Sequence, residues 1–264
     1  MAVAYSIVIP AFNESAALPG TLSAVRAAMA AVEAEGGDGF RGPFRERFRG
    51  QFRGRGEIVV VDNNSSDDTA EVARAHGADR VVLEPVNQIG RARNAGAAGA
   101  DASSPWLVFL DADTQLSAGV LGEALRRLSE GDAGGGARVE LDAEVGIVPR
   151  LGCWLWEVIS RRRNLAAGCF LFCRRDAFEA VGGFDLRYFV KEEIYLSSRL
   201  KRWAAERGTR FEVFQDPAIV TSTRKLDRFL REVPLILFVG LAPWAARTPR
   251  FCRYWYRQRG SAGA

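Results

Sequence analysis

The stretch WLVFLDAD, residues 106–113, decides the fold class. Five consecutive apolar residues are typical of a strand that is covered on both faces within a parallel sheet. Asp111, Ala112 and Asp113 follow directly, so this strand delivers two carboxylates at its carboxyl end. Ligands of open α/β sheets bind beyond the carboxyl ends of the strands. The stretch therefore predicts an α/β fold with a ligand site around Asp111 and Asp113.

Two earlier apolar runs end in the same way. Residues 5–10 (YSIVIP) lead to Asn13 and Glu14, and residues 57–61 (EIVVV) lead to Asp62 and Asn63. Strands that alternate with helices predict a doubly wound, mostly parallel sheet. We also expect strands at 80–83, within 139–148 and at 211–214, and helices at 18–32, 67–76, 90–100, 116–128, 154–163, 176–181 and 192–207.

Length and charge set broader limits. A chain of 264 residues fits one large α/β domain. The formal charge of +4 is uneven, because Phe-Arg-Gly recurs at 40–42, 48–50 and 52–54. We interpret residues 36–56 as a low-complexity flexible insert. Two explanations of its arginines stay open: a solvated loop, or a contact with phosphate, anionic lipid or nucleic acid.

The cysteines and the apolar runs indicate a cellular location. No paired zinc spacing and no secretory signal are found, so we expect reduced thiols and a cytoplasmic protein. The four cysteines are Cys153, Cys169, Cys173 and Cys252. No apolar run reaches the roughly 20 residues that cross a bilayer. The longest, residues 233–246, contains two prolines and predicts a buried helix or a membrane-surface contact.

The Asp111–Asp113 pair allows two interpretations. Two carboxylates just past a strand can hold Mg²⁺ or Mn²⁺, which commonly bridge protein carboxylates to substrate phosphates. Alternatively, Asp111, Asp113 and Thr114 are all residues that cap the start of a helix. An isolated Asp-x-Asp does not distinguish a metal site from a helix cap, so the distinction depends on the surrounding motifs.

Five segments occur in an order that carries more information than any one of them. They are SIVIPAFNE (6–14), VVVDNNSSDDT (59–69), IGRARNAG (89–96), WLVFLDAD (106–113) and GGFDLRYFVKEEIYLSSRLKR (182–202). In this order they resemble the family 2 nucleotide-diphospho-sugar glycosyltransferases of the GT-A fold, over about residues 5–223. The resemblance implies one domain over 1–264, with a nucleotide-sugar-binding half at 1–115, an acceptor half at 116–230 and an apolar and basic C-terminal segment at 231–264.

The resemblance implies a donor site that carries Mn²⁺ or Mg²⁺. Its nucleotide pocket would consist of Pro10, Phe12, Asn13 and Glu14, with Asp62 or Asn63 at the base and Arg91 or Arg93 at the diphosphate. Asp113 would bind the metal directly, and Asp111 would hold the ribose or a metal-bound water. Asn63 departs from the second aspartate that the family usually has there, which leaves the identity of the base open.

The resemblance also implies an acceptor site with a carboxylate base. Glu193 would remove the proton of an acceptor hydroxyl, with Glu192 as the alternative, in a displacement that inverts the anomeric configuration. Many relatives place a histidine metal ligand after the late strand, whereas this chain has VTSTR at 220–224. The metal would then rely on Asp113, phosphates and water, with Arg224 or Lys225 assisting the phosphates. An acceptor pocket could form around Trp154, Trp156 and Arg161–Arg163.

The expected partners are a nucleotide-diphospho-sugar donor and a hydroxyl acceptor, which could be a small molecule, a glycan or a lipid-linked group. A membrane-surface contact is compatible with the C-terminal segment, and no nucleic acid is expected. A nucleotidyltransferase is the second candidate, but it needs a basic, glycine-rich loop after the first strand, and residues 10–14 are neither. A non-catalytic nucleotide-, RNA- or membrane-binding protein is the third, and Asp113 and Glu193 together argue against it.

Overall fold

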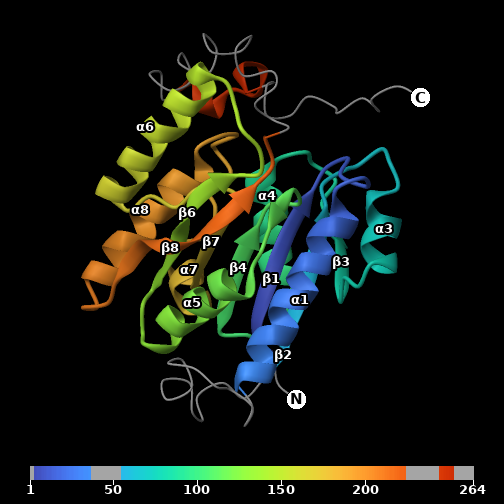
Figure 1. Cartoon of the computed structure of the whole chain (residues 1–264), viewed down its shortest axis with the longest axis horizontal. Coiled ribbons are helices and arrows are strands. Elements are labelled where there is room, and N and C mark those ends of the chain that lie inside the picture. The colour runs from blue at the N-terminus through green and yellow to red at the C-terminus, as the bar shows by residue number, and fades with distance from the viewer. Residues whose placement is uncertain (1–2, 37–54, 224–243, 253–264) are drawn as a thin grey trace.

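A computed structural model describes residues 3–36, 55–223 and 244–252. In these residues one sheet has the strand order β3-β2-β1-β4-β7-β6-β8-β5 (Figure 1). The strands are β1 (Val3–Ala11), β2 (Arg55–Asp62), β3 (Arg80–Leu83), β4 (Trp106–Leu110), β5 (Thr114–Gln115), β6 (Gly134–Leu141), β7 (Phe170–Arg174) and β8 (Phe211–Thr221).

The sheet is parallel in its first half and mixed in its second. Strand β1 pairs in parallel with β2 and β4, and β2 pairs in parallel with β3. Strand β7 is antiparallel to β4 and β6, while β6 and β8 are parallel to each other. Because β1, β2 and β4 run the same way, their carboxyl ends meet at one edge of the sheet. The predicted doubly wound, mostly parallel α/β sheet is confirmed.

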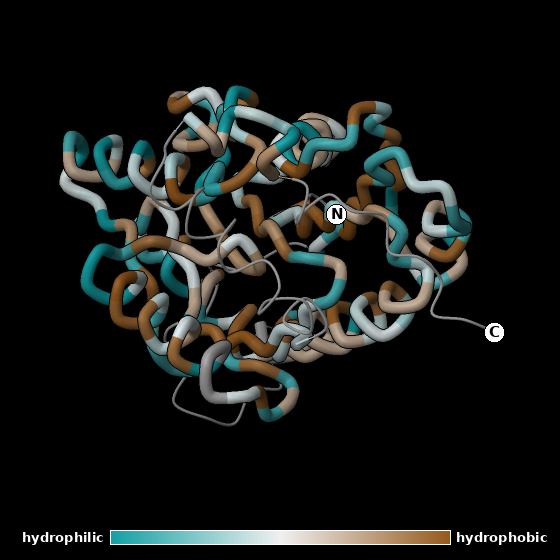
Figure 2. The backbone as a smooth tube through the Cα atoms, turned by 90° about the horizontal axis from the view of Figure 1, so that it is seen from above, coloured by the Kyte–Doolittle hydropathy of each residue, from teal (hydrophilic) through white to brown (hydrophobic). Residues whose placement is uncertain are grey.

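Helices cover both faces of the sheet. They are α1 (Leu18–Gly36), α3 (Thr69–Ala75), α4 (Ile89–Gly99), α5 (Ala118–Ser129), α6 (Ile147–Arg163), α7 (Arg175–Ala180) and α8 (Glu192–Ala205), with the short turns η2 (Ala245–Arg247) and η3 (Pro249–Phe251). One hydrophobic core joins α1, α3 and α5 to the sheet, and a second joins α4, α7 and α8 to it. In the view from above, hydrophobic stretches run through the middle of the molecule (Figure 2).

The two cores follow from the pleat of the strands. Tyr5, Ile7 and Ile9 of β1 belong to the first core, while Val8 belongs to the second. Successive side chains of a strand point to opposite faces, so a continuous apolar run serves a sheet that is covered on both sides. The small residues of α4 bring that helix close: a Cβ at Gly96 would lie 2.8 Å from Val61 Cγ2.

The second half of the chain differs from the expectation in several respects: α6 begins at Ile147 rather than at 154, β8 continues to Thr221 rather than ending at 214, and β7 was not expected as a strand. We expected strands within 139–148, but β6 ends at Leu141 and α6 begins at Ile147, so that prediction is wrong for residues 142–148. Strand β6 begins earlier, at Gly134, where three glycines in a row let neighbouring strands approach. A Cβ at Gly134 would lie 2.8 Å from Cys173 Cβ. A glycine run carries no hydrophobic pattern, so the sequence did not indicate this part of the strand.

Several predicted features lie outside the described residues. These are most of the 36–56 insert, Arg224, Lys225 and the greater part of the 231–264 segment. The insert is narrower than expected, because α1 extends to Gly36 and β2 begins at Arg55. Among the helices that the structure describes, none combines the length and apolar character needed to span a membrane. The four cysteines are free thiols.

Candidate active site

Two loops at the carboxyl ends of β1 and β2 form one unit, which we call the donor-side loops (residues 12–15 and 62–69). Asn13 has a left-handed backbone with a φ of 53°, a conformation that asparagine tolerates better than most residues. Its backbone N–H donates to Ser65 Oγ at 3.0 Å, and its Oδ1 accepts from the Ser66 N–H at 2.8 Å. The neighbouring Pro10 is buried, and Phe12 is half-buried.

Further bonds tie the donor-side loops together. The buried Glu14 donates its backbone N–H to Thr69 Oγ1 at 2.9 Å, and Asp67 Oδ2 accepts from Ser15 Oγ at 2.7 Å. Partial burial acts to raise the pKa of Asp67, but hydrogen bonds from Ser15 and Thr69 outweigh it and lower that pKa below its usual range. Near neutral pH, Asp67 is therefore ionised in the folded protein.

Asp62 and Asn63 take different positions at the end of β2. Asp62 Oδ1 accepts from the Ser65 N–H at 2.9 Å, which closes the turn. Asn63 is buried, its backbone N–H donates to Ala11 O at 2.8 Å, and its side-chain oxygen accepts from the Gln88 N–H at 3.3 Å. Asn63 thus joins the donor-side loops to the start of α4.

A second group of side chains, which we call the carboxylate cluster, consists of Arg93, Asp111, Glu192 and Glu193. Arg93 lies on α4 and is 1% exposed. Its Nη1 donates to Glu192 Oε1 at 2.7 Å, and its Nη2 donates to Asp111 Oδ1 at 2.9 Å and to Gly168 O at 2.6 Å. Arg93 therefore joins the end of β4 to the start of α8.

Glu193 belongs to the same cluster. A Cβ built at Gly168 would lie 3.5 Å from Arg93 Nη2 and 3.6 Å from Glu193 Cδ, which are ordinary contact distances, so Gly168 lies beside both side chains. Glu193 is half-buried, whereas Glu192 is buried against Arg93. Of the two glutamates, Glu193 is therefore the one that is more exposed to solvent.

The protonation of Glu192 and Glu193 is shifted, because both glutamates are at least partly buried close to other carboxylates. Burial, together with the charge of Glu193, raises the pKa of Glu192 to about 8 against the opposing effect of Arg93. Burial and the charge of Asp111 raise the pKa of Glu193, and Arg93 again opposes them. Because a third negative charge is poorly compensated, the cluster retains a proton at pH values where an exposed glutamate has lost its own.

Asp113 lies next to the end of β8. The Ser222 N–H donates to Asp113 O at 3.2 Å, and the hydroxyl oxygens of Thr114 and Thr221 lie 2.9 Å apart. The Asp113 side chain is mostly buried. Residues 220–223 therefore return to the Asp-x-Asp turn, and Ser222 lies where the sequence resemblance leads us to expect a histidine. In the described part of the chain, no group of three or more His, Cys, Asp or Glu side chains could hold a metal ion.

The two candidate arginines of α4 point in different directions. Residues two apart on a helix are separated by about 200°. Arg93 faces the carboxylate cluster, whereas Arg91 Nε donates to Glu84 Oε1 at 3.3 Å near the protein surface. The structure therefore brings Arg93 together with Asp111, Glu192 and Glu193, and it does not bring Arg91 there.

Two further residues hold the segment that leads into α8, and the sequence analysis missed them. Gln88 is buried, and its Nε2 donates to Leu186 O at 2.8 Å and to Tyr188 O at 3.0 Å. The side chain of Asn94 pairs with both backbone groups of Phe184 at 2.9 Å. Their position within or beside the IGRARNAG segment is the signal that could have indicated them.

The described C-terminal residues pack against the same segment. The Phe189 N–H donates to Ala246 O at 2.8 Å, and Arg247 Nη2 donates to the Tyr188 hydroxyl at 2.6 Å. The Tyr188 ring stacks on Tyr195 with centroids 3.7 Å apart. Residues 244–252 therefore help to fix the approach to Glu192 and Glu193.

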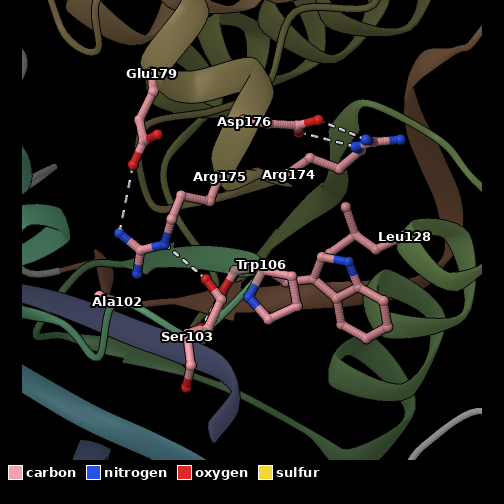
Figure 3. A pocket seen from close by; sticks show the side chains of 10 residues that line it. Ala102, Ser103, Trp106, Leu128, Arg174, Arg175, Asp176 and Glu179 are labelled. Carbon is pink, nitrogen blue, oxygen red and sulfur yellow. Dashed lines mark hydrogen bonds and ion pairs between the residues drawn. The ribbon is translucent and has the colours of Figure 1, made fainter.

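A hollow of about 450 Å³ lies elsewhere, next to Trp106 at the amino end of β4 (Figure 3). Its arginines bond to the protein itself: Arg174 pairs with Asp176 at 2.5 Å, and Arg175 Nε donates to Ser104 O at 2.6 Å. Asp111 lies at the other end of the same strand, so this hollow is separate from the carboxylate cluster.

The sheet, with β1, β2 and β4 parallel and polar turns at their carboxyl ends, is a fold of the GT-A class, which solved glycosyltransferases share. The chain belongs to the glycosyl transferase family 2, whose family model matches residues 6–180. This confirms the resemblance seen in the sequence motifs. The expected role of each predicted site residue stays a prediction.

The similarity to curated relatives covers part of each protein. The uncharacterized glycosyltransferase Rv0539 of Mycobacterium tuberculosis is 35% identical over 128 residues, which are 48% of this chain and 45% of that protein. The uncharacterized glycosyltransferase Mb0553 of Mycobacterium bovis matches to the same extent. The aligned part thus spans less than half the length of these relatives.

Solved structures share the fold at low identity. The mannosyltransferase PcManGT of Pyrobaculum calidifontis, in complex with GDP-Man and Mn²⁺, has a TM-score of 0.59 at 17% identity, covering 97% of this chain and 69% of its own. TarS of S. aureus has a TM-score of 0.57 at 16% identity, covering 97% and 44%. Glucosyl-3-phosphoglycerate synthase of Mycobacterium tuberculosis, with Mn²⁺, UDP and its product, has a TM-score of 0.52 at 19% identity, covering 90% and 79%.

Proposed function

We propose that this protein transfers a sugar from a nucleotide-diphospho-sugar to a hydroxyl acceptor, with inversion of the anomeric configuration. The observation that carries the proposal is the contact of Arg93 with Asp111 and Glu192. This contact joins the strand end expected to meet the donor to the glutamate pair expected to meet the acceptor. Family membership and the nucleotide-sugars bound to proteins of the same fold support the donor class.

The donor-side loops would bind the nucleotide. Pro10, Phe12, Asn13 and Glu14 would shape the pocket, and Asp62 or Asn63 would face the base. In this proposal Asn63 fixes the loop through the hydrogen bond that it accepts from the Gln88 N–H, and it would offer its side-chain amide to the base. An amide offers both a donor and an acceptor, whereas a carboxylate only accepts.

Asp113 would hold Mg²⁺ or Mn²⁺ together with the donor phosphates. Carboxylate and phosphate oxygens form the hard donor set that these ions prefer, and such ions usually keep several waters, so one or two protein ligands suffice. The bound ion would neutralise the diphosphate and make it a better leaving group. Asp111 would contribute through a metal-bound water or the ribose, because Arg93 already occupies its Oδ1.

Glu193 is the proposed base. It would take the proton of the acceptor hydroxyl as that oxygen bonds to the anomeric carbon, while the bond from this carbon to the diphosphate breaks and nucleoside diphosphate leaves. A raised pKa suits this task, because a base whose pKa approaches the working pH accepts a proton more readily. Glu192 is engaged by Arg93, which makes it the weaker candidate.

The geometry favours different tasks for the two arginines. Arg93 is committed to Asp111, Glu192 and Gly168, so we assign it the positioning of both halves of the site rather than a direct phosphate contact. Arg91 is partly exposed and paired with Glu84, and its contact with the diphosphate stays a prediction. A cytoplasmic location and the absence of a nucleic-acid partner also stay predictions.

The test is turnover with a panel of nucleotide-sugars, Mn²⁺ and candidate acceptors, read out as released nucleoside diphosphate. Glu193→Gln should keep donor binding and lower transfer by about 10²- to 10⁴-fold. Glu179→Gln, at a side chain that is 65% exposed on α7, is the matched control and should leave the rate unchanged. Asp113→Ala should abolish the stimulation of donor binding by metal.

Other outcomes separate the alternatives. Release of pyrophosphate from a nucleoside triphosphate would establish a nucleotidyltransferase instead. Donor binding without turnover, with every donor and acceptor tried and with an intact fold, would leave a non-catalytic nucleotide-binding protein. A fully active Glu193→Gln variant would place the base elsewhere.

A further inference from the structure

Helix α6 presents its hydrophobic side to solvent. Leu151, Trp154, Leu155 and Ile159 are 61%, 57%, 52% and 38% exposed. They recur at spacings of three and four residues, so they lie on one face of the helix. A surface helix normally buries such a stripe against the core, and α6 does the opposite.

The other side of α6 faces the protein. Ser160 is buried, and its Oγ donates to Leu165 O at 2.8 Å. The helix ends at Asn164, which has a left-handed backbone and whose Oδ1 accepts from the Val213 N–H at 3.4 Å. The helix is thus anchored on its polar side, at the outer edge of the molecule (Figure 1). A contiguous apolar stripe on such an anchored helix indicates an interaction surface.

Positive charges flank the stripe. The exposed arginines of α6 are Arg150, Arg161, Arg162 and Arg163, and the helix carries a single acid, Glu157. Within residues 3–36, 55–223 and 244–252, no ion pair neutralises any of these four arginines, in contrast to Arg126, Arg127 and Arg187 on other surfaces. The partner of this face is therefore expected to be both apolar and anionic.

We propose that α6 is a membrane-docking helix and that its partner is the surface of an anionic lipid bilayer. An interfacial helix inserts an apolar face that includes Trp, Leu or Phe into the headgroup region, and its arginines meet anionic headgroups. The stripe includes Trp154, and tryptophan is enriched where an apolar surface meets the headgroups of a membrane.

The charges argue against a second copy of this chain as the partner. A two-fold contact would lay one α6 stripe on another and would gather the arginines of both copies along one interface. Like charges brought together without acids to pair with them oppose association. An anionic bilayer instead complements both features of the face at once.

The docked face lies close in the chain to the proposed active site. Residues 164–169 connect α6 to β7, and within them Gly168 O accepts from Arg93 at 2.6 Å. Docking would therefore hold at the bilayer a helix whose following loop contacts Arg93 of the carboxylate cluster. The docking itself does not depend on glycosyl transfer, so it can be tested without any substrate.

The test is co-sedimentation of the full chain with vesicles of phosphatidylcholine alone and of phosphatidylcholine mixed with phosphatidylglycerol. We expect binding to the mixed vesicles only, weakened by salt. Trp154→Glu should weaken it by about tenfold or more, and the double variant R161Q/R162Q by about fivefold for each arginine. Leu155→Glu is a second variant on the same face, and thermal unfolding checks that each variant is folded.

The control is Leu83→Glu, because Leu83 is 67% exposed on β3, away from α6. It should bind the mixed vesicles as the unchanged protein does. Absence of binding by the unchanged protein, or unaltered binding by both Trp154→Glu and Leu155→Glu, would overturn the proposal. So would self-association that these variants abolish while vesicle binding is absent, because the face would then serve a second copy.

Discussion

The donor-side loops and the carboxylate cluster lie at the same edge of the sheet, but different chemistry holds them. The loops are joined by short polar side chains and backbone groups, and several of these bonds are exposed, as in the bond from Ser15 to Asp67. The cluster is joined by one buried arginine between carboxylates. Exposed hydrogen bonds contribute little each, whereas a buried charge is very costly once its partner is removed. The two regions should therefore respond very differently to substitution.

The largest expected effect is that of Arg93→Met. The substitution removes the cation shared by the buried Glu192 and the partly buried Asp111, which should lower the free energy of unfolding by about 3–5 kcal/mol. Chemical denaturation at neutral pH measures it. Arg91→Met is the matched control on the same helix, and because its pair with Glu84 is partly exposed, it should cost at most about 1 kcal/mol. Equal losses of unfolding free energy in the two variants would show that the buried contacts of Arg93 stabilise the fold no more than the partly exposed pair of Arg91.

The second expected effect is a pH dependence of stability. Glu192 has a pKa raised from 4.5 to about 8 in the folded protein. Between these values the folded protein binds a proton that the unfolded chain has released, so the free energy of unfolding falls as pH rises through the window. The fall can reach about 1.4 kcal/mol per pH unit. The contribution is complete below the lower value and lost above the upper one.

Glu193→Gln sharpens this second prediction. The charge of Glu193 helps to raise the pKa of Glu192, so its removal should narrow the pH window over which stability falls. Denaturation at a series of pH values measures the window, and Glu179→Gln should leave it unchanged because that side chain is exposed. Stability that rises with pH across this window would contradict the assignment.

The sequence predicted those parts of the site that depend on local order. A buried strand followed by a polar turn places Asp111 and Asp113 at the sheet edge whatever the rest of the chain does. The same holds for Asn13 and Asp62, whose strands are parallel neighbours. The order of the five motifs along the chain also predicted the glutamate pair, because the pair follows the Asp-x-Asp motif in the segment 182–202.

The sequence could not predict how those parts are joined. Arg93 contacts Glu192 across 99 residues of chain, and its burial depends on the packing of α4, β4 and α8. In the sequence, Arg91 and Arg93 are equivalent candidates. Only the orientation of α4 in the fold shows that Arg93, and not Arg91, faces the carboxylate cluster. Gln88 and Asn94 were missed for the same reason, since their partners are backbone groups of a distant turn.

The smallest expected effect belongs to the donor-side loops. Asp67→Ala removes the acceptor of bonds from Ser15 and Thr69, which should lower the free energy of unfolding by about 1 kcal/mol at neutral pH. Asp68→Ala is the matched control, because that neighbouring side chain makes no capping hydrogen bond. Thermal unfolding at pH 7 measures both variants.

The pH dependence of this last variant separates the two regions. The pKa of Asp67 is lowered in the folded protein, so its contribution is present above the ordinary value of 3.8 and is lost as pH falls through the folded pKa. The difference between Asp67→Ala and the unchanged protein should therefore shrink in acid, whereas the contribution of Glu192 is lost towards alkaline pH. A cost of Asp67→Ala that persists unchanged in acid would mean that packing, rather than the ionised carboxylate, joins the donor-side loops.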